Sequence, residues 1–219
     1  MRKVIVGTFL SLDGVMQAPG GPEEDTSGGF RFGGWLVPHM DETTGAAVGA
    51  LFERPFDLLL GRRTYDIFAG YWPYVQKDEK AKDYDAGTAE LGRKFDAATK
   101  HVATHRASSL GWKNSKPLGA DFVSAMKALK KTDGPDLVVQ GSSELIHQLL
   151  AADLVDVTQL LIFPIILGKG RRLFDGGEAP AGLKLVKSEA SAKGVILARY
   201  ERSGEVKTGS FVFDNPDAA

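Results

Sequence analysis

The chain has 219 residues, of which 43% are hydrophobic and 25% charged, the composition of an ordinary globular protein with room for one large domain. Its 27 lysines and arginines and 28 aspartates and glutamates leave a net charge of -1, so no overall positive field attracts nucleic acid or an anionic membrane. The absence of cysteine excludes disulfides, thiolate metal sites and a cysteine nucleophile, and makes the cytoplasm the expected compartment. No apolar run approaches the ~20 residues that cross a bilayer.

The first part of the chain predicts two strands separated by a long loop and a helix. Residues 3–10 are β-branched and apolar, which is typical of a strand. Residues 17–38 contain too many glycines and prolines for regular structure, and ordered loops of this length usually serve a function. A helix follows over about 41–53, and the apolar residues 58–60 predict a buried strand.

The rest of the chain alternates between strands and helices and then becomes β-rich. The polar, lysine-rich segment 71–92 shows no clear period, and its structure is left open. Strands alternate with helices through Asp153 and stand alone after it, which predicts a mostly parallel sheet with an antiparallel edge. The remaining predicted elements are helices at 64–69, 121–131 and 145–150, strands at 100–104, 137–140 and 154–166, and a hairpin over 183–200 with its turn at 192–194.

Two strand ends carry the residue types that bind phosphate. The strand at 58–60 ends in Gly61-Arg62-Arg63-Thr64, where the glycine admits a ligand close to the backbone, the guanidinium forks neutralise phosphate, and the threonine caps a helix or donates its hydroxyl. The strand at 137–140 ends in Gly141-Ser142-Ser143-Glu144, at a helix start whose free N–H groups attract anions. Two such corners suit a dinucleotide. The ordinary alternatives are surface arginines at a helix start and a serine cap.

Other patterns favour structural roles. Gly168-Lys169-Gly170-Arg171-Arg172 precedes Leu173-Phe174 rather than a helix, which favours a turn between strands. No segment matches a full Rossmann or P-loop fingerprint, and Gly141-Ser142-Ser143 lacks the second glycine of a nucleophile elbow. The four histidines form no close set of metal ligands, so no metal site is predicted.

The order of the motifs resembles the dihydrofolate reductase superfamily, and most closely the stand-alone relatives of the reductase domain of bacterial bifunctional riboflavin-biosynthesis proteins (RibD). The resemblance implies a single-domain α/β fold over residues 1–203, with a mixed, mainly parallel eight-stranded sheet flanked by helices, and a C-terminal tail over 204–219. The zinc deaminase half of those proteins needs cysteines and is missing here. The motifs are Ser11-Leu12-Asp13-Gly14, Gly61-Arg62-Arg63-Thr64-Tyr65, Gln140-Gly141-Ser142-Ser143-Glu144-Leu145, Leu154-Val155-Asp156 and the segment 164–174.

The resemblance also implies a cofactor, NADPH, lying across the carboxyl ends of the strands. Two adjacent arginines favour the phosphorylated cofactor over NAD, because a guanidinium group can donate two hydrogen bonds to an ester phosphate. The implied contacts are Gly61, Arg62, Arg63 and Thr64 with the 2′-phosphate and pyrophosphate, Gly141, Ser142, Ser143 and Glu144 with the pyrophosphate, Thr104, His105 and Arg106 with the adenosine end, and Met16 and Gln17 with the nicotinamide.

The substrate side is predicted from two residues. Dihydrofolate reductases carry an acid shortly after a Trp-x-x-Pro, where it supports protonation of the reduced ring. Here Trp35-Leu36-Val37-Pro38 is followed by Asp41, one residue late, so Asp41 is either a catalytic acid with a raised pKa or the cap of the next helix. Phe68 either stacks on a planar substrate or packs in the core.

The predicted function is an NADPH-dependent reductase that transfers hydride to a small pterin- or aminopyrimidine-like substrate, with the loops at 17–38 and 71–92 as lids. The resemblance implies an activity like that of 5-amino-6-(5-phosphoribosylamino)uracil reductase, and a homodimer through the β-rich C-terminal region. One alternative is an NADP-binding module without turnover, acting as a sensor or partner-binding protein. Another is a nucleic-acid binder using Arg171 and Arg172, which the near-neutral charge opposes. No nucleic-acid or membrane partner is expected.

Overall fold

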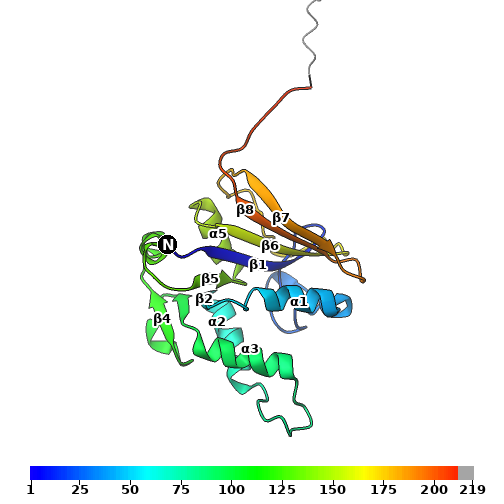
Figure 1. Cartoon of the computed structure of the whole chain (residues 1–219), viewed down its shortest axis with the longest axis vertical. Coiled ribbons are helices and arrows are strands. Elements are labelled where there is room, and N and C mark those ends of the chain that lie inside the picture. Colours follow the sequence, from blue (N-terminus) through cyan, green and yellow to red (C-terminus); the bar gives the residue numbers. More distant parts are fainter. Residues whose placement is uncertain (212–219) are drawn as a thin grey trace, which may run out of the picture.

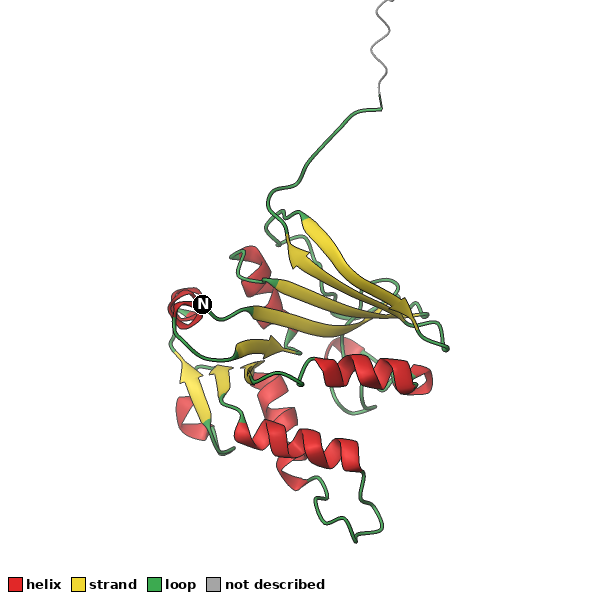
Figure 2. Cartoon of the chain, in the orientation of Figure 1, coloured by secondary structure: helices red, strands yellow, loops and turns green. Residues whose placement is uncertain are grey.

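The most apolar strands occupy the middle of one eight-stranded sheet in the computed structural model, which describes residues 1–211 (Figure 1). The strand order is β4-β3-β2-β5-β1-β6-β8-β7. Buried residues dominate the central strands because helices cover both faces of the sheet there (Figure 2). The strands are β1 Val4–Ser11, β2 Phe56–Gly61, β3 Lys100–Ala103, β4 Ser115–Leu118, β5 Asp136–Val139, β6 Val157–Phe163, β7 Leu183–Ala190 and β8 Ile196–Arg202.

Alternate side chains of the central strands enter two different cores. In β2, Leu59 packs with one buried cluster, whereas Leu58 and Leu60 pack with the other, as the two-residue period of a strand requires. The first cluster includes residues of α4 and α5, and the second includes residues of α2 and α3. The helices are α1 Glu42–Ala50, α2 Arg62–Tyr71, α3 Ala86–Ala97, α4 Phe122–Lys131 and α5 Ser143–Ala151.

The pairing of the strands confirms the predicted fold class. β1 lies parallel to both β5 and β6, and β2 lies parallel to β3 and β5. Only β8 and β7 run antiparallel to their neighbours within the described chain, which gives the mainly parallel sheet its antiparallel edge. The carboxyl ends of β1, β2, β3 and β5 therefore lie along the same edge of the sheet.

Two elements escaped the sequence prediction. β4 reads Ser-Lys-Pro-Leu, without alternation, and its proline is tolerated because the strand lies at the edge of the sheet. Helix α3 begins inside the segment whose structure was left open. Asp85 caps it by accepting from the N–H of Thr88 at 2.7 Å, but two of its three buried residues are small, so it lacks a broad apolar stripe.

Strand β8 ends at Arg202, and residues 204–211 of the predicted tail form neither helix nor strand. The rest of that tail, 212–219, lies outside the described residues. Across residues 1–211, none of the helices combines the length and apolarity needed to span a bilayer.

Lys100, at the start of β3, joins helix α3 to the sheet. Its side chain is fully buried, and its ammonium donates to the carbonyl oxygens of Phe95 at 2.7 Å, Asp96 at 3.2 Å and Ala98 at 2.9 Å. The same nitrogen lies 4.2 Å from the centre of the Trp112 ring. A cation thus satisfies the carbonyls at the end of α3, where the helix dipole is negative.

We predict that Lys100→Met lowers the free energy of unfolding by about 2 kcal/mol near neutral pH, because it leaves buried carbonyls without a donor. Urea denaturation measures the change, and Lys113→Met, at an exposed position, is the control. Burial lowers the pKa of Lys100 from 10.5 to about 8. The unfolded chain therefore binds more protons between these values, and the contribution of Lys100 to stability rises with pH there. An unchanged slope in the variant would contradict this.

Candidate functional site

The two phosphate-type corners predicted from the sequence meet in the structure. β2 and β5 are neighbours, and the N–H of Gly61 donates to the carbonyl of Gly141 at 3.4 Å. A Cβ on Gly61 would lie 2.2 Å from the hydroxyl oxygen of Ser142, and one on Gly141 would lie 2.8 Å from that of Thr64. Gly141 also has a φ of +158°, which side-chain-bearing residues rarely adopt. Glycine at both positions therefore allows the two strand ends to touch.

Two adjoining cavities open at this junction. The larger has a volume of about 630 Å³ and the smaller about 120 Å³, and Arg63, Ile67, Ser142 and Arg171 line both. We call the two together the groove. It runs along the carboxyl ends of the parallel strands, where α/β proteins usually bind ligands. Each cofactor residue expected from the sequence lines it, namely Met16, Gln17, Gly61, Arg62, Arg63, Thr64, Thr104, His105, Arg106, Gly141, Ser142, Ser143 and Glu144.

The arginines of the groove differ in what they already bind. The Nε of Arg62 lies 2.9 Å from both carboxylate oxygens of Asp66, and its Nη1 donates to Ser109 at 2.7 Å, so this residue holds the loop after β3. The guanidinium of Arg106 lines the larger cavity without a hydrogen bond or ion pair to any residue in the 1–211 range. Arg106 is thus the cation that can bind a phosphate without losing a protein contact.

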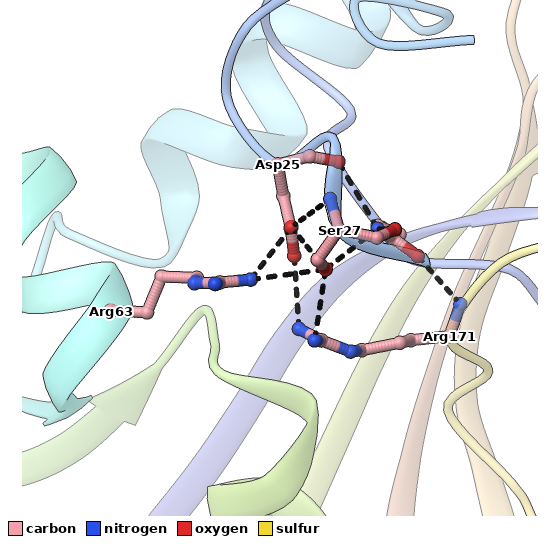
Figure 3. Close-up of polar contacts among 5 residues, drawn as sticks. Asp25, Ser27, Arg63 and Arg171 are labelled. Atoms are coloured by element: carbon pink, nitrogen blue, oxygen red, sulfur yellow. Dashed lines mark hydrogen bonds and ion pairs between the residues drawn. The ribbon is translucent and has the colours of Figure 1, made fainter. Parts of the chain in front are cut away.

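The glycine-rich loop 17–38 is fastened across the groove by four residues, which we call the Asp25 cluster (Figure 3). The Asp25 carboxylate pairs with Arg63 at 2.6 Å and Arg171 at 2.9 Å, and the Ser27 hydroxyl oxygen accepts from the same guanidiniums at 3.2 and 3.0 Å. Burial opposes ionisation of Asp25, but hydrogen bonds from Ser27 and Arg63 and the charge of Arg171 outweigh it and lower its pKa. The cluster joins the loop to α2 and to the segment after β6.

Gln17 also stabilises this loop, through hydrogen bonds of its side-chain amide. Its amide nitrogen donates to the carbonyls of Asp25 at 3.1 Å and Ser27 at 3.0 Å, and its amide oxygen accepts from the N–H of Arg171 at 3.1 Å. The indole N–H of Trp35 donates to the Gln17 carbonyl at 2.8 Å. These hydrogen bonds give the loop a defined structure. By contrast, no residue of 71–92 lines the groove.

The two predicted substrate residues have different surroundings. Asp41 caps α1: one carboxylate oxygen accepts from the N–H of Thr44 at 2.9 Å and the other from that of Lys193 at 3.1 Å. The Thr44 hydrogen bond is the main reason why the pKa of Asp41 falls to about 2. Asp41 does not line the groove, so the structure supports its cap interpretation. Phe68 lines the smaller cavity and stacks on Phe95 with ring centres 5.8 Å apart, a core contact, and its stacking on a substrate stays a prediction.

Several groove residues were not found from the sequence. Glu24 and Asp25 lie in the loop, and Arg171 was assigned to a connecting turn. Arg171 does belong to that connection, since the next residue, Arg172, forms an isolated β-bridge with Val15. Arg171 also lines the groove. The one signal for them in the sequence was the presence of acidic residues in a glycine-rich loop.

A small cluster of potential metal ligands lies beside the groove. His147, Asp175 and Glu178 place one ligand atom each within 4.8 Å of one another, a grouping that their sequence spacing did not predict. Both ring nitrogens of His147 already have partners, Asp175 at 3.1 Å and the carbonyl of Arg172 at 2.9 Å. The Glu178 oxygens accept from backbone N–H groups. These contacts explain the grouping as a set of loop interactions.

Comparison with known proteins identifies the family. Residues 2–197 match the model of the RibD C-terminal domain. The chain belongs to this family. The uncharacterized protein YyaP of Bacillus subtilis (strain 168) is 24% identical over 204 residues, which cover 93% of this chain and 96% of YyaP. The family is one of reductase-type oxidoreductases, which confirms the resemblance noted in the sequence.

Solved structures share the fold. A putative riboflavin biosynthesis protein from Shewanella sp. PV-4 has a TM-score of 0.66 and 22% identity, covering 92% of this chain and 99% of that one. Dihydrofolate reductase from Enterococcus faecalis, solved with NADP(H), has a TM-score of 0.53 and 14% identity, covering 91% and 96%. The single α/β domain with a dihydrofolate-reductase-like fold is therefore confirmed.

The contact between the strand ends gives a prediction about Gly61. We expect Gly61→Ala to lower the free energy of unfolding by about 1–3 kcal/mol, because the new methyl group overlaps the Ser142 side chain. Adding Ser142→Gly to this variant removes the overlapping atoms and should restore part of the loss. A double-mutant cycle by urea denaturation measures the coupling, and additive effects would contradict it.

Proposed function

We propose that this protein is an NADPH-dependent reductase that transfers hydride to a small heterocyclic substrate of the aminopyrimidine or pterin type. The observation that carries the proposal is the groove formed where Gly61 meets Gly141, with cationic side chains at one end and a small, partly apolar cavity at the other. Membership of the RibD C-terminal domain family supports a reductase, and the solved dihydrofolate reductase with NADP(H) supports the coenzyme.

The residues of the groove fit such a coenzyme. Because Gly61 and Gly141 place no side chain at the junction, the backbone N–H groups there and the start of α5 are accessible to a pyrophosphate. Arg106 and His105 line the larger cavity, where a phosphate ester on the adenosine would find an unpaired guanidinium. The smaller cavity, with Met16 and Phe68 in its wall, has the size of one planar ring. When bound, NADPH supplies the hydride, and the protein supplies placement and exclusion of water.

Entry of a substrate requires the loop 17–38 to move. A cavity of about 120 Å³ cannot hold a nicotinamide ring and a second heterocycle together. The Asp25 cluster holds the loop with charged contacts between partly exposed groups, which break at lower cost than buried apolar packing. The loop 17–38 therefore retains its proposed role as a lid, whereas the segment 71–92 lies away from the groove.

One observation favours the second candidate, an NADP-binding module without turnover. Asp41, the residue expected to support protonation, serves as a helix cap instead. Coenzyme titration followed by a test of NADPH oxidation with pterins, aminopyrimidines and simple carbonyl compounds separates the candidates. Binding with oxidation supports the reductase, binding alone supports the module, and absence of binding rejects both. The cytoplasmic location expected from the lack of cysteine stays a prediction.

The 2′-phosphate contact gives the sharpest test of the coenzyme. We predict that Arg106→Ala raises the dissociation constant of NADPH about 10-fold and that of NADH less than 2-fold, since one charge-assisted hydrogen bond contributes about 1.5 kcal/mol. Fluorescence titration measures both constants. Arg93→Ala, an exposed arginine on α3, is the matched control. Equal losses for NADPH and NADH would show that Arg106 does not hold the 2′-phosphate.

We also propose that a second copy of the chain covers strand β7. Every residue of this edge strand is exposed, and Leu183, Leu185 and Val186 each leave about half of their surface in water, at 50%, 49% and 50%. An exposed edge strand that carries apolar side chains is a template for pairing with another chain. Sedimentation equilibrium should show a dimer at micromolar concentrations, and Leu185→Lys should shift it toward monomer. A wild-type monomer would contradict this proposal.

A further inference from the structure

Glu24 has an unusual position for an acidic residue. It lies in the loop 17–38, and it is one of the residues that line the smaller cavity, together with Met16, Phe68 and Gly141. One carboxylate oxygen accepts from the N–H of Gly20 at 2.7 Å. Among the described residues, no lysine or arginine forms an ion pair with it. The structure thus holds a carboxyl group at the small end of the groove without a cation to keep it ionised.

The adjacent residues Glu24 and Asp25 have opposite electrostatic surroundings. Burial raises the pKa of Glu24, and the charge of Asp25 adds to the effect, while hydrogen bonds from Gly20 and Gly21 oppose it. Asp25, by contrast, is paired with two guanidiniums and keeps a lowered pKa. Paired carboxyl groups whose pKa values are separated in this way are typical of sites in which one group holds a proton and the other stays charged.

The other charged groups around the smaller cavity do not compensate Glu24. They are Asp25 from the loop, Arg63 from α2 and Arg171 from the segment after β6. Both arginines direct their guanidinium groups at Asp25 and Ser27 (Figure 3). No lysine or histidine lines this cavity. Glu24, whose pKa is raised, is therefore the carboxyl group of this cavity that has no cation beside it.

We propose that Glu24 is the proton donor of this reductase site. The inference rests on the proposed function, and it supplies the acid that Asp41 does not. As hydride adds to the carbon of a C=N or C=O bond, the π electrons of that bond move to the nitrogen or oxygen. That atom takes the proton of the Glu24 carboxyl group, which is left as a carboxylate and regains a proton from water. The substrate is reduced by two electrons, and NADPH is oxidised to NADP⁺.

The first test needs no substrate. The nicotinamide ring of NADP⁺ is positively charged, whereas that of NADPH is neutral, so NADP⁺ in the cavity favours ionised Glu24. We expect NADP⁺ binding at mildly acid pH to release more protons than NADPH binding, as measured by calorimetry in buffers of different ionisation enthalpy. Glu24→Gln should abolish this difference while keeping an amide oxygen as acceptor for Gly20 and Gly21. The neighbouring, exposed Glu23→Gln is the matched control.

The second test uses whichever acceptor the wild-type protein reduces fastest. Glu24→Gln should lower kcat about 100-fold or more, with the dissociation constant of NADPH changed less than about 3-fold. The wild-type rate should fall as pH rises through the pKa of Glu24, because the proton is lost, and the variant should lose this dependence. Asp41→Asn is measured beside it.

The outcomes separate the two proposals. If the wild-type protein binds neither coenzyme, the proposed function fails. If both coenzymes bind but Glu24→Gln matches the wild type in proton release and in rate, the assignment of Glu24 is overturned while the coenzyme proposal stands. A large loss of kcat in Asp41→Asn with none in Glu24→Gln would likewise overturn it.

Discussion

The direct contact between the ends of β2 and β5 is the constraint on which the rest of the site depends. Because the strands are parallel neighbours, both chains leave the sheet at the same edge, and the residues after each strand begin a helix. Gly61 and Gly141 let these two exits approach until one backbone N–H meets the other carbonyl. A Cβ at Gly61 would overlap the Ser142 side chain, and one at Gly141 would overlap that of Thr64. The identity of two small residues thus determines where polar groups converge.

The central strands and these exits could be predicted from the sequence because their signals are local. An apolar run followed by glycine and a cationic or hydroxyl residue describes its own surroundings, and adjacent parallel strands bring such segments together. Helix α3 and strand β4 were not predicted because the features that stabilise them are not local in the sequence. Their packing relies on small residues and on an edge position, and the lysine that fastens α3 lies beyond its end, at the start of the next strand. Local periodicity contains no information of this kind.

The loop residues were beyond sequence reasoning because their partners are distant in the chain. Asp25 pairs with Arg171 across 146 positions, and Gln17 reaches the same segment across 154. The Gly-Lys-Gly-Arg stretch was correctly interpreted as a connection, but only the folded chain shows that this connection pairs with Val15, just after β1, and lines the groove. Asp41 illustrates a different limit. It follows the Trp-x-x-Pro motif one residue late, so the sequence left open whether it is a catalytic acid or a helix cap. Hydrogen bonds from the N–H groups of Thr44 and Lys193 support the cap.

The Asp25 cluster also affects the affinity of the ligand-free protein for small anions. The carboxylate of Asp25 occupies the position between the guanidinium groups of Arg63 and Arg171. A small free anion would bind at the same position. The apparent dissociation constant of such an anion is its intrinsic constant divided by the fraction of molecules in which that position is vacant. A small anion with few other contacts to make therefore competes with the Asp25 carboxylate for the position between Arg63 and Arg171. A larger ligand that also occupied the junction of the strands would add further contacts to this competition with the Asp25 carboxylate.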